Sequence, residues 1–331
     1  MEKIRVLVVG YGNVGRGVLL SLKNQPDMEV VGIASRSVER VKKNVKDIPV
    51  VSIADAEACK ALNPDVAILC GGSKNDLPQQ GPEIVKYFNT VDSFDNHSCI
   101  PQYHAAMDEA AKKAGHVAVI STGWDPGIFS LERTLANAFL PGARSYGFYG
   151  LSPAGGLSMG HSDALRTIKG VADARQFTHA IPEAIEQVRK GENPVFEAGD
   201  MHMRECFVVL EDGADASAIE AEIKAMPGYF APYKTTVNFV SQEELNAKYA
   251  GFPHDGCVVA SSVTGDGNRA SVEYRCTWAS NPEATANVLV AHARAAVRMN
   301  KSGDCGAKTI LDIPPKMLSP LSYEELLKKF M

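Results

Sequence analysis

The sequence lacks the features that mark secreted, membrane-bound or nucleic-acid-binding proteins. Among its 331 residues no apolar run approaches membrane-spanning length, and the first residues do not read as a signal peptide. Basic residues number 34 against 39 acidic ones, so the net charge of −5 gives no basic footprint for nucleic acid. The seven cysteines show no C-x-x-C spacing, which favours reduced thiols over disulfides or zinc. We therefore expect a cytoplasmic protein with no metal and no membrane or nucleic-acid partner.

A strand-like run followed by a glycine-rich turn stands at the start of the chain. Residues 4–16 read as an apolar β-branched run that breaks at Gly10, with further glycines at Gly12 and Gly15. In a dinucleotide-binding unit these glycines permit the turn, the approach of a pyrophosphate and close helix packing. The alternative is an ordinary glycine-rich turn, but an apolar-periodic helix follows it. The residues expected to contact the dinucleotide here are Gly10, Tyr11, Gly12, Asn13, Val14 and Gly15.

The end of the second predicted strand, residues 28–34, indicates which dinucleotide binds. Units that prefer NAD usually place Asp or Glu near this point, whereas this chain has Ser35, Arg36 and Ser37. Arg36 can pair with a 2′-phosphate, and the two hydroxyls can donate hydrogen bonds to it. The alternative is a solvated surface arginine. We predict that the cofactor is NADP.

Strands and helical patterns alternate up to residue 120, which predicts an α/β fold with a doubly wound, Rossmann-type parallel sheet. Ligands in such sheets lie at the carboxyl ends of the strands. The fourth predicted strand ends at Cys70, Gly71, Gly72 and Ser73, which are therefore expected to border the cofactor. Past Gly127 the strict alternation stops, and strands in succession predict a second α+β domain built on an open mixed sheet.

Polar clusters follow the next two predicted strands, at residues 91–97 and 121–127. If both strands belong to one sheet, Asp95 and Asp125 converge over the same crevice. Paired carboxylates there suit a substrate that carries an ammonium group, and they can relay protons. The alternative for the first cluster is a cap and turn before the helix expected at 101–114.

Four motifs together resemble the meso-diaminopimelate D-dehydrogenase family. They are Gly-Tyr-Gly-Asn-Val-Gly-Arg at 10–16, Phe-Asp-Asn-His at 94–97, Ser-Thr-Gly-Trp-Asp-Pro-Gly at 121–127 and Gly-His-Ser-Asp-Ala-Leu-Arg at 160–166. The likeness runs nearly end to end and includes Pro253-His254 and Asn281-Pro282. It implies NADP-dependent oxidative deamination of the D-centre of meso-2,6-diaminopimelate to L-2-amino-6-oxopimelate and ammonia, or the reverse reductive amination. The product belongs to lysine and peptidoglycan-precursor biosynthesis.

The resemblance also implies a set of site residues. Asp95 and Asp125 would be catalytic and bind the D-centre nitrogen. The full substrate-binding set is Asp95, Trp124, Asp125, Phe148, Tyr149, Met159, Gly160, Thr178, Arg204, His254 and Asn281. Further cofactor contacts are expected at Ser93, Phe94, Asp95, Thr122, Gly123, Trp124, Asp125 and Pro126. The distal L-centre carboxylate would be held by Thr178, Arg204 and His254, with Asn281 at the same end. Each of these four is also consistent with a purely structural role, such as helix capping by Asn281.

The same resemblance organises the chain into three parts. We expect a dinucleotide-binding domain at 1–122, a substrate-binding and dimerisation domain at 123–290, and a C-terminal helix and tail at 291–331 that return to the first domain. The protein is expected to be a homodimer that acts on a small-molecule substrate.

Two departures from the family pattern bear on substrate range. Tyr149 stands where a tryptophan is expected, and residues 151–155 form an insertion before a loop expected to cover the D-centre. His161 could take part in proton transfer or be a capping neighbour at a helix start.

Two other functions stay open from the sequence alone. The protein could be another nicotinamide-dependent reductase of the aspartate pathway, or a non-catalytic NADP-binding sensor.

Overall fold

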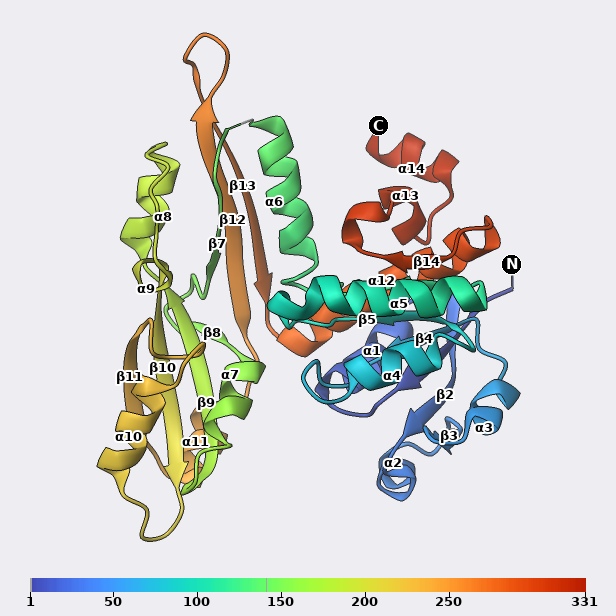
Figure 1. Cartoon of the computed structure of the whole chain (residues 1–331), viewed down its shortest axis with the longest axis horizontal. Coiled ribbons are helices and arrows are strands. Elements are labelled where there is room, and N and C mark those ends of the chain that lie inside the picture. Colours follow the sequence, from blue (N-terminus) through green and yellow to red (C-terminus); the bar gives the residue numbers. More distant parts are fainter. Residues whose placement is uncertain (1, 141) are drawn as a thin grey trace. The chain divides into compact units, whose positions relative to one another are not determined.

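The computed structural model describes residues 2–140 and 142–331, and the chain divides into two compact units (Figure 1). The first unit comprises the chain up to Leu131 together with Pro282–Met331, and the second comprises Glu132–Asn281. The functional boundaries expected from the sequence, at 122 and 290, stay predictions. Within the described residues, no helix is long and apolar enough to cross a membrane.

The first unit is built on a seven-stranded sheet in the order β14-β6-β5-β4-β1-β2-β3, in which every neighbouring pair is parallel. Its strands are β1 (Ile4–Val9), β2 (Met28–Ser35), β3 (Val50–Ser52), β4 (Val66–Leu69), β5 (Asn89–Asp92), β6 (Val117–Val119) and β14 (Gly306–Lys308). The predicted doubly wound sheet is thus confirmed. Its strand order reverses between β1 and β4, and ligands of such sheets bind at this point.

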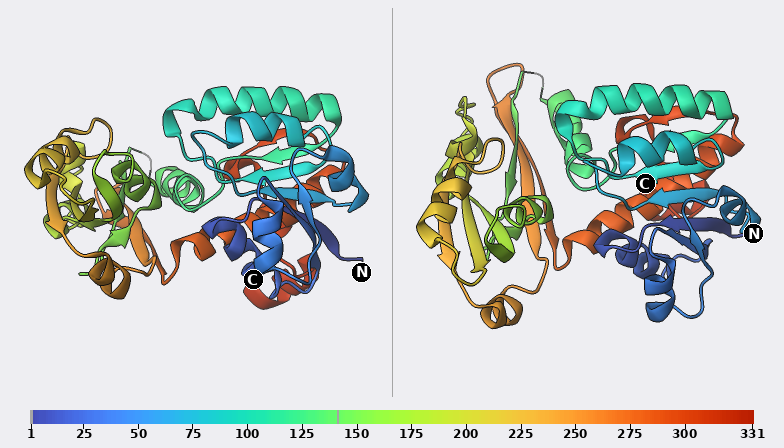
Figure 2. Two further views of the ribbon diagram at one scale, coloured as in Figure 1. Left: turned by 90° about the horizontal axis from the view of Figure 1, so that it is seen from below. Right: turned by 60° about the horizontal axis from the view of Figure 1, so that its bottom comes forward.

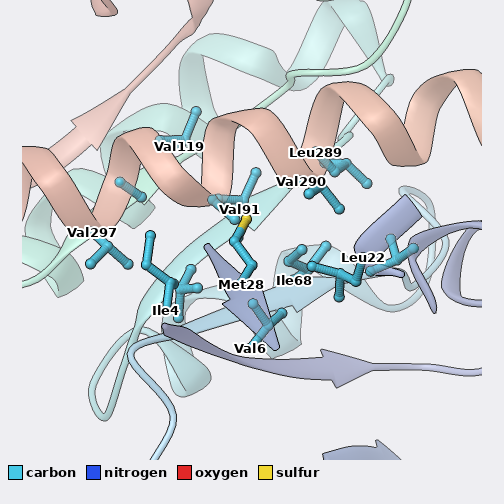
Figure 3. Packing of buried hydrophobic residues seen from close by; sticks show 14 of the residues in the cluster. Ile4, Val6, Leu22, Met28, Ile68, Val91, Val119, Leu289, Val290 and Val297 are labelled. Atoms are coloured by element: carbon cyan, nitrogen blue, oxygen red, sulfur yellow. The ribbon is translucent and has the colours of Figure 1, made fainter. Parts of the chain in front are cut away.

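Helices cover both faces of this sheet, as Figure 2 shows for α1 and α5. They are α1 (Asn13–Leu22), α2 (Val38–Asn44), α3 (Ala56–Ala61), α4 (Leu77–Ile84), α5 (Ile100–Ala114) and α12 (Asn281–Lys301), with α6 (Ile128–Phe139) leading into the second unit. One core cluster joins α1 and α12 to the sheet, and the opposite cluster joins α4 and α5 to it. Figure 3 shows Leu289, Val290 and Val297 of α12 packed among sheet residues.

The C-terminal segment packs on α12 within the first unit. It contains α13 (Pro315–Leu318) and α14 (Tyr323–Phe330), and β14 extends the sheet by pairing with β6. Arg294 of α12 is 1% exposed; it donates two 2.7 Å hydrogen bonds to the Asp27 carboxylate and one to the Leu318 carbonyl oxygen. Arg298 donates to the carbonyl oxygens of Met317 and Ser319. These bonds fasten the tail to the helix.

The second unit contains the expected open mixed sheet and, in addition, a separate antiparallel sheet. The four-stranded sheet β11-β10-β9-β8 is mixed, because β10 is parallel to β11 and antiparallel to β9. The other three strands, in the order β13-β12-β7, form a separate antiparallel sheet. The strands are β7 (Ser145–Tyr149), β8 (Gly156–Leu157), β9 (Val171–Ala180), β10 (His202–Leu210), β11 (Lys234–Phe239), β12 (His254–Val263) and β13 (Arg269–Trp278). The long β12–β13 hairpin satisfies the inner backbone groups of both strands, so β12 has only its other edge free, and β7 occupies it.

Five helices complete the second unit: α7 (Met159–Leu165), α8 (Pro182–Arg189), α9 (Ala198–Met201), α10 (Ala216–Ala225) and α11 (Gln242–Lys248). Leu165 of α7 and Ile223 of α10 pack against Cys206 on one face of the mixed sheet, and Leu245 of α11 packs against the other face. Since side chains alternate along a strand, Arg204 shares the face of Cys206.

Candidate active site

The glycine turn has the geometry that a bound dinucleotide needs. Gly10 adopts a φ of +102°, which L side chains rarely adopt. A Cβ on Gly15 would lie 2.2 Å from the Gly10 carbonyl oxygen, so only glycine fits where α1 crosses the turn. Gly12 is the N-cap residue of α1 and has no side chain with which to cap it. The first N–H groups of α1 are therefore available to an anion.

Arg36 follows β2 directly, at the carboxyl edge of the sheet. Its side chain is 71% exposed, and its Nη1 lies 2.9 Å from Asp76 Oδ1. The other oxygen, Asp76 Oδ2, accepts a 3.0 Å hydrogen bond from the Gly72 N–H. The guanidinium is thus held beside the turn that follows β4. Nothing local in the sequence links Asp76 to Arg36, because the two residues are 40 positions apart.

The loops that follow β4, β5 and β6 meet at the same edge of the sheet. Asp95 is exposed, and its N–H donates a 3.0 Å hydrogen bond to Ser73 Oγ, which joins the second loop to the first. Asp125 is half-buried in the third loop. This loop closes tightly, because a Cβ on Gly127 would lie 2.0 Å from the Gly123 carbonyl oxygen. Both aspartates therefore sit on constrained backbone in the first unit.

Asp92, the last residue of β5, is fully buried beneath these loops. Its carboxylate accepts hydrogen bonds from the N–H groups of Phe94 and Ser121 and from the Tyr103 hydroxyl. Burial raises its pKa to about 6, although the three hydrogen bonds act in the opposite direction. Local sequence offered only a cap or turn role for it.

In the second unit, Arg204 of β10 lies opposite Thr178 of β9. Its guanidinium donates a hydrogen bond to Thr178 Oγ1 and lies 4.0 Å from the centre of the Tyr233 ring. The arginine is 8% exposed, and burial lowers its pKa. Among the described residues, no carboxylate forms an ion pair with it. A buried cation in this state is matched to an anionic ligand.

Histidines surround this arginine. Burial, together with the Arg204 charge, lowers the pKa of His202 to about 3 and that of His254 to about 4. His202 Nε2 accepts a 3.0 Å hydrogen bond from the Tyr149 N–H, and the two rings stack with centres 5.2 Å apart. The His254 ring is 6.4 Å from that of Tyr149. At neutral pH both imidazoles are uncharged, so Arg204 supplies the positive charge. His202 and Tyr233 were missed because neither belongs to a recognisable motif.

His161 is a capping neighbour, the interpretation favoured from its position near a helix start. Ser158 is the N-cap residue of α7 and accepts a hydrogen bond from the His161 N–H. The His161 ring lies edge-on to Tyr229 and Phe230. Burial is the main cause that lowers its pKa.

The remaining expected substrate residues occupy varied positions in the second unit. Phe148 is fully buried, with its ring centre 6.1 Å from that of His202. Met159 and Gly160 begin α7, and Asn281 begins α12 and donates its N–H to the Phe252 carbonyl oxygen. Across the described residues, no group of three or more His, Cys, Asp or Glu side chains could hold a metal ion.

Known proteins resemble this chain over its full length. Residues 123–280 match the diaminopimelic acid dehydrogenase C-terminal domain. The meso-diaminopimelate D-dehydrogenase of Ureibacillus thermosphaericus is 49% identical over all of both chains. The DAP dehydrogenase of C. glutamicum, solved in complex with DAP, superposes with a TM-score of 0.93 at 42% identity over all of both chains. An engineered D-amino acid dehydrogenase bound to NADP+ gives a TM-score of 0.89 at 41% identity, over 99% of this chain and 100% of its own. On this evidence the chain belongs to the meso-diaminopimelate D-dehydrogenase family.

Proposed function

We propose that this protein catalyses the NADP-dependent oxidative deamination of the D-centre of meso-2,6-diaminopimelate to L-2-amino-6-oxopimelate and ammonia, and the reverse reductive amination. The observation that carries the proposal is the buried Arg204, which forms no ion pair with a carboxylate of the described residues. A dicarboxylic substrate supplies such a carboxylate. The relatives named above support the same activity.

The cofactor is NADP, held by the first unit. The pyrophosphate would be held by Gly12 and the N-terminus of α1, where N–H groups and the helix dipole favour an anion. Arg36 would pair with the 2′-phosphate, with Ser35 and Ser37 as neighbouring donors. The turn at Cys70–Ser73 and the loops around Phe94 and Thr122 complete the contacts. When bound, the cofactor supplies a hydride acceptor at its nicotinamide ring.

Each unit contributes its own set of substrate-binding residues. Asp95 and Asp125 bind the nitrogen of the D-centre, because a carboxylate pair attracts an ammonium group. Arg204, Thr178 and His254 bind the carboxylate of the L-centre, and Asn281 lies at the same end. Since His202 and His254 are neutral, the side chains around Arg204 offer one full positive charge for one carboxylate. This balance avoids the desolvation of surplus charge.

The protein's own residues remove a proton from the substrate as well as orient it. Hydride leaves the D-centre carbon only when the attached amine is neutral, so the ammonium must first lose a proton. A carboxylate of the aspartate pair accepts that proton, directly or through water. Water then hydrolyses the resulting iminium of the substrate, releasing ammonia. Anchoring the L-centre fixes which of the two amino centres reacts.

We also propose that the protein works as a homodimer in the cytoplasm, without a membrane or nucleic-acid partner. Phe139 and Val195 are 62% and 75% exposed, and exposed apolar side chains are common at subunit contacts. The net charge of −5 disfavours nucleic acid. Light scattering during gel filtration measures the oligomeric state, and a monomer at working concentration would contradict the dimer.

The activity is tested with purified protein, NADP and the meso-, LL- and DD-isomers of diaminopimelate. We expect NADPH to form readily with meso-diaminopimelate. With the DD-isomer it should form at most slowly, and with the LL-isomer it should not form. In reverse, NADPH oxidation must depend on ammonia. Ammonia-independent oxidation would indicate another reductase, and NADPH binding without turnover would indicate a sensor.

A further inference from the structure

Asp92 occupies a position from which one side chain reaches both aspartate loops. Its Oδ1 accepts hydrogen bonds from the Phe94 N–H at 3.0 Å and from the Ser121 N–H at 3.1 Å. Its Oδ2 accepts the Tyr103 hydroxyl at 2.8 Å. Its backbone carbonyl oxygen accepts the Thr122 N–H at 3.0 Å. Three separate segments of the first unit therefore converge on this residue.

The hydrogen-bonded segments are those that carry the proposed amine-binding groups. Phe94 immediately precedes Asp95, and Ser121 and Thr122 begin the loop that contains Asp125. Ser121 has a φ of +52°, an uncommon conformation for a residue other than glycine. Such conformations persist where the surroundings hold them. The N–H of Ser121 is one of the groups that Asp92 holds.

Tyr103 couples this arrangement to α5. Besides its hydroxyl bond to Asp92, its ring stacks on that of Phe94 with centres 4.2 Å apart. Phe94 is thus held by its N–H and by its ring. Both Tyr103 and Phe94 are almost fully buried.

The carboxylate at position 92 has a specific advantage over an amide of the same shape. It is acceptor-only, so its oxygens can take all three donors at once. In asparagine the amide NH₂ would either face a backbone N–H or donate to the Tyr103 hydroxyl, which would then lose position 92 as the acceptor of its own proton. A fully buried carboxylate carries a desolvation cost, which points to a role in placing the loops.

We infer that Asp92 and Tyr103 are positioning residues that set the backbone of Asp95 and Asp125 relative to one another. The inference rests on the proposed function, because it assumes that these two aspartates bind the reacting nitrogen. Asp92 and Tyr103 act through the loops and touch no substrate.

The test compares Asp92→Asn and Tyr103→Phe with native protein. Because misplacement by about 1 Å can lower a rate about a hundredfold, we expect Asp92→Asn to lower kcat about 10- to 100-fold and to raise KM for meso-diaminopimelate. Tyr103→Phe removes one of the three bonds, so its effect is smaller. The double variant is expected to be little worse than Asp92→Asn, since the two residues act as a unit.

The readouts separate positioning from a loss of folded protein. A smaller active fraction lowers kcat but leaves KM and the deuterium isotope effect at the D-centre unchanged. Misplacement raises KM and, by slowing hydride transfer, increases the isotope effect on kcat. Asp108→Asn is a control, because the Asp108 carboxylate also accepts a backbone N–H, that of Ala307, but its hydrogen bonds go to Ala307 and Lys112 and not to the aspartate loops. It is expected to leave KM and the isotope effect unchanged.

The outcomes distinguish this inference from the proposed function. If native protein is active and Asp95→Asn and Asp125→Asn are impaired, while a folded Asp92→Asn keeps native KM and isotope effect, the inference is wrong. If Asp92→Asn does not fold, Tyr103→Phe decides by the same two measurements. If native protein does not oxidise meso-diaminopimelate, the proposed function is wrong, and the inference, which rests on it, is wrong as well.

Discussion

Arg204 shows how one buried charge can define a ligand. It is 8% exposed, its neighbours Thr178 and Tyr233 are neutral, and its Nε is buried without a hydrogen-bond partner within the described part of the chain. A guanidinium in such surroundings is stabilised when a carboxylate binds it. Placed by itself on a strand, the same arginine would be an ordinary surface charge. Its burial opposite Thr178 supports its proposed role as a binding group.

Arg204→Met is expected to lower kcat/KM for meso-diaminopimelate severely. Truncating one partner of a buried charge pair typically costs about 2 to 5 kcal/mol. Activity on D-amino acids that lack a distal carboxylate should change little, because those substrates do not use the arginine. The measured quantity is the ratio of the two activities in native and variant protein.

Arg175→Met provides the control for this comparison. Arg175 lies on β9, three residues from Thr178, but it pairs with Asp173 at 2.9 Å. Its substitution should leave the ratio of activities unchanged. An unchanged ratio in Arg204→Met as well would rule out Arg204 as the distal anchor.

Arg36→Asp is expected to weaken NADP binding far more than NAD binding. A charge-assisted hydrogen bond to the 2′-phosphate contributes roughly 1.5 to 3 kcal/mol, and the new carboxylate would repel the phosphate. Titration calorimetry with both cofactors measures the difference. Lys86→Asp makes the same charge change in the turn between α4 and β5, and should not discriminate between the cofactors. Equal affinity of native protein for NAD and NADP would contradict the role of Arg36.

At the level of elements, α12 depends on a polar contact inside an otherwise apolar interface. The helix buries an alanine- and valine-rich face against the sheet, yet Arg294 lies within that face. Its guanidinium donates two hydrogen bonds to the carboxylate of Asp27, just before β2. It also donates to the Gln25 side chain and to the Leu318 carbonyl oxygen. One side chain thereby joins the start of β2, α12 and the C-terminal tail.

Arg294→Met is expected to lower the free energy of unfolding of the first unit by about 3 to 5 kcal/mol, because it removes the hydrogen bonds of a buried guanidinium and leaves Asp27 only the more distant Arg298 as a cationic partner. Arg298→Met is the control, since Arg298 is about one-third exposed and lies 3.9 Å from Asp27. It should cost less. Urea unfolding followed by Trp124 fluorescence in a Trp278→Phe background reports on the first unit, because each unit holds one of the two tryptophans. Equal losses in both variants would contradict this account.

For the molecule as a whole, the buried histidines predict acid sensitivity of the second unit. The pKa of His202 is lowered to about 3 and that of His254 to about 4, mainly by burial. Between these values and about 6.5 the unfolded chain binds more protons, so stability falls as the pH falls through this window. Each histidine should cost on the order of 1 to 2 kcal/mol between pH 6.5 and 5.

Urea unfolding at several pH values, followed by Trp278 fluorescence in a Trp124→Phe background, measures this slope. His202→Gln should reduce it, since glutamine does not titrate. A stability of the second unit that is constant between pH 6.5 and 5 would contradict the neutral state of both imidazoles.

Much of the fold could be predicted because its signals are local. The glycine turn, the apolar runs of β1 and β4 and the periodicity of α5 are each set by neighbours in sequence, and the predicted doubly wound sheet is the one observed. The motif residues that carry the family resemblance are also local. Substrate class and cofactor could therefore be predicted without coordinates.

Tertiary structure decided what depends on distant residues. The burial of Asp92 and its bonds to Tyr103 and Ser121 join segments up to 29 residues apart, and the contact of Asp76 with Arg36 spans 40. The separation of β7, β12 and β13 into their own sheet likewise depends on pairing that no single strand encodes. Local patterns fix the backbone conformation of each segment. Burial, and with it each pKa and each available charge, is set only when the segments pack together, because desolvation depends on every neighbour at once.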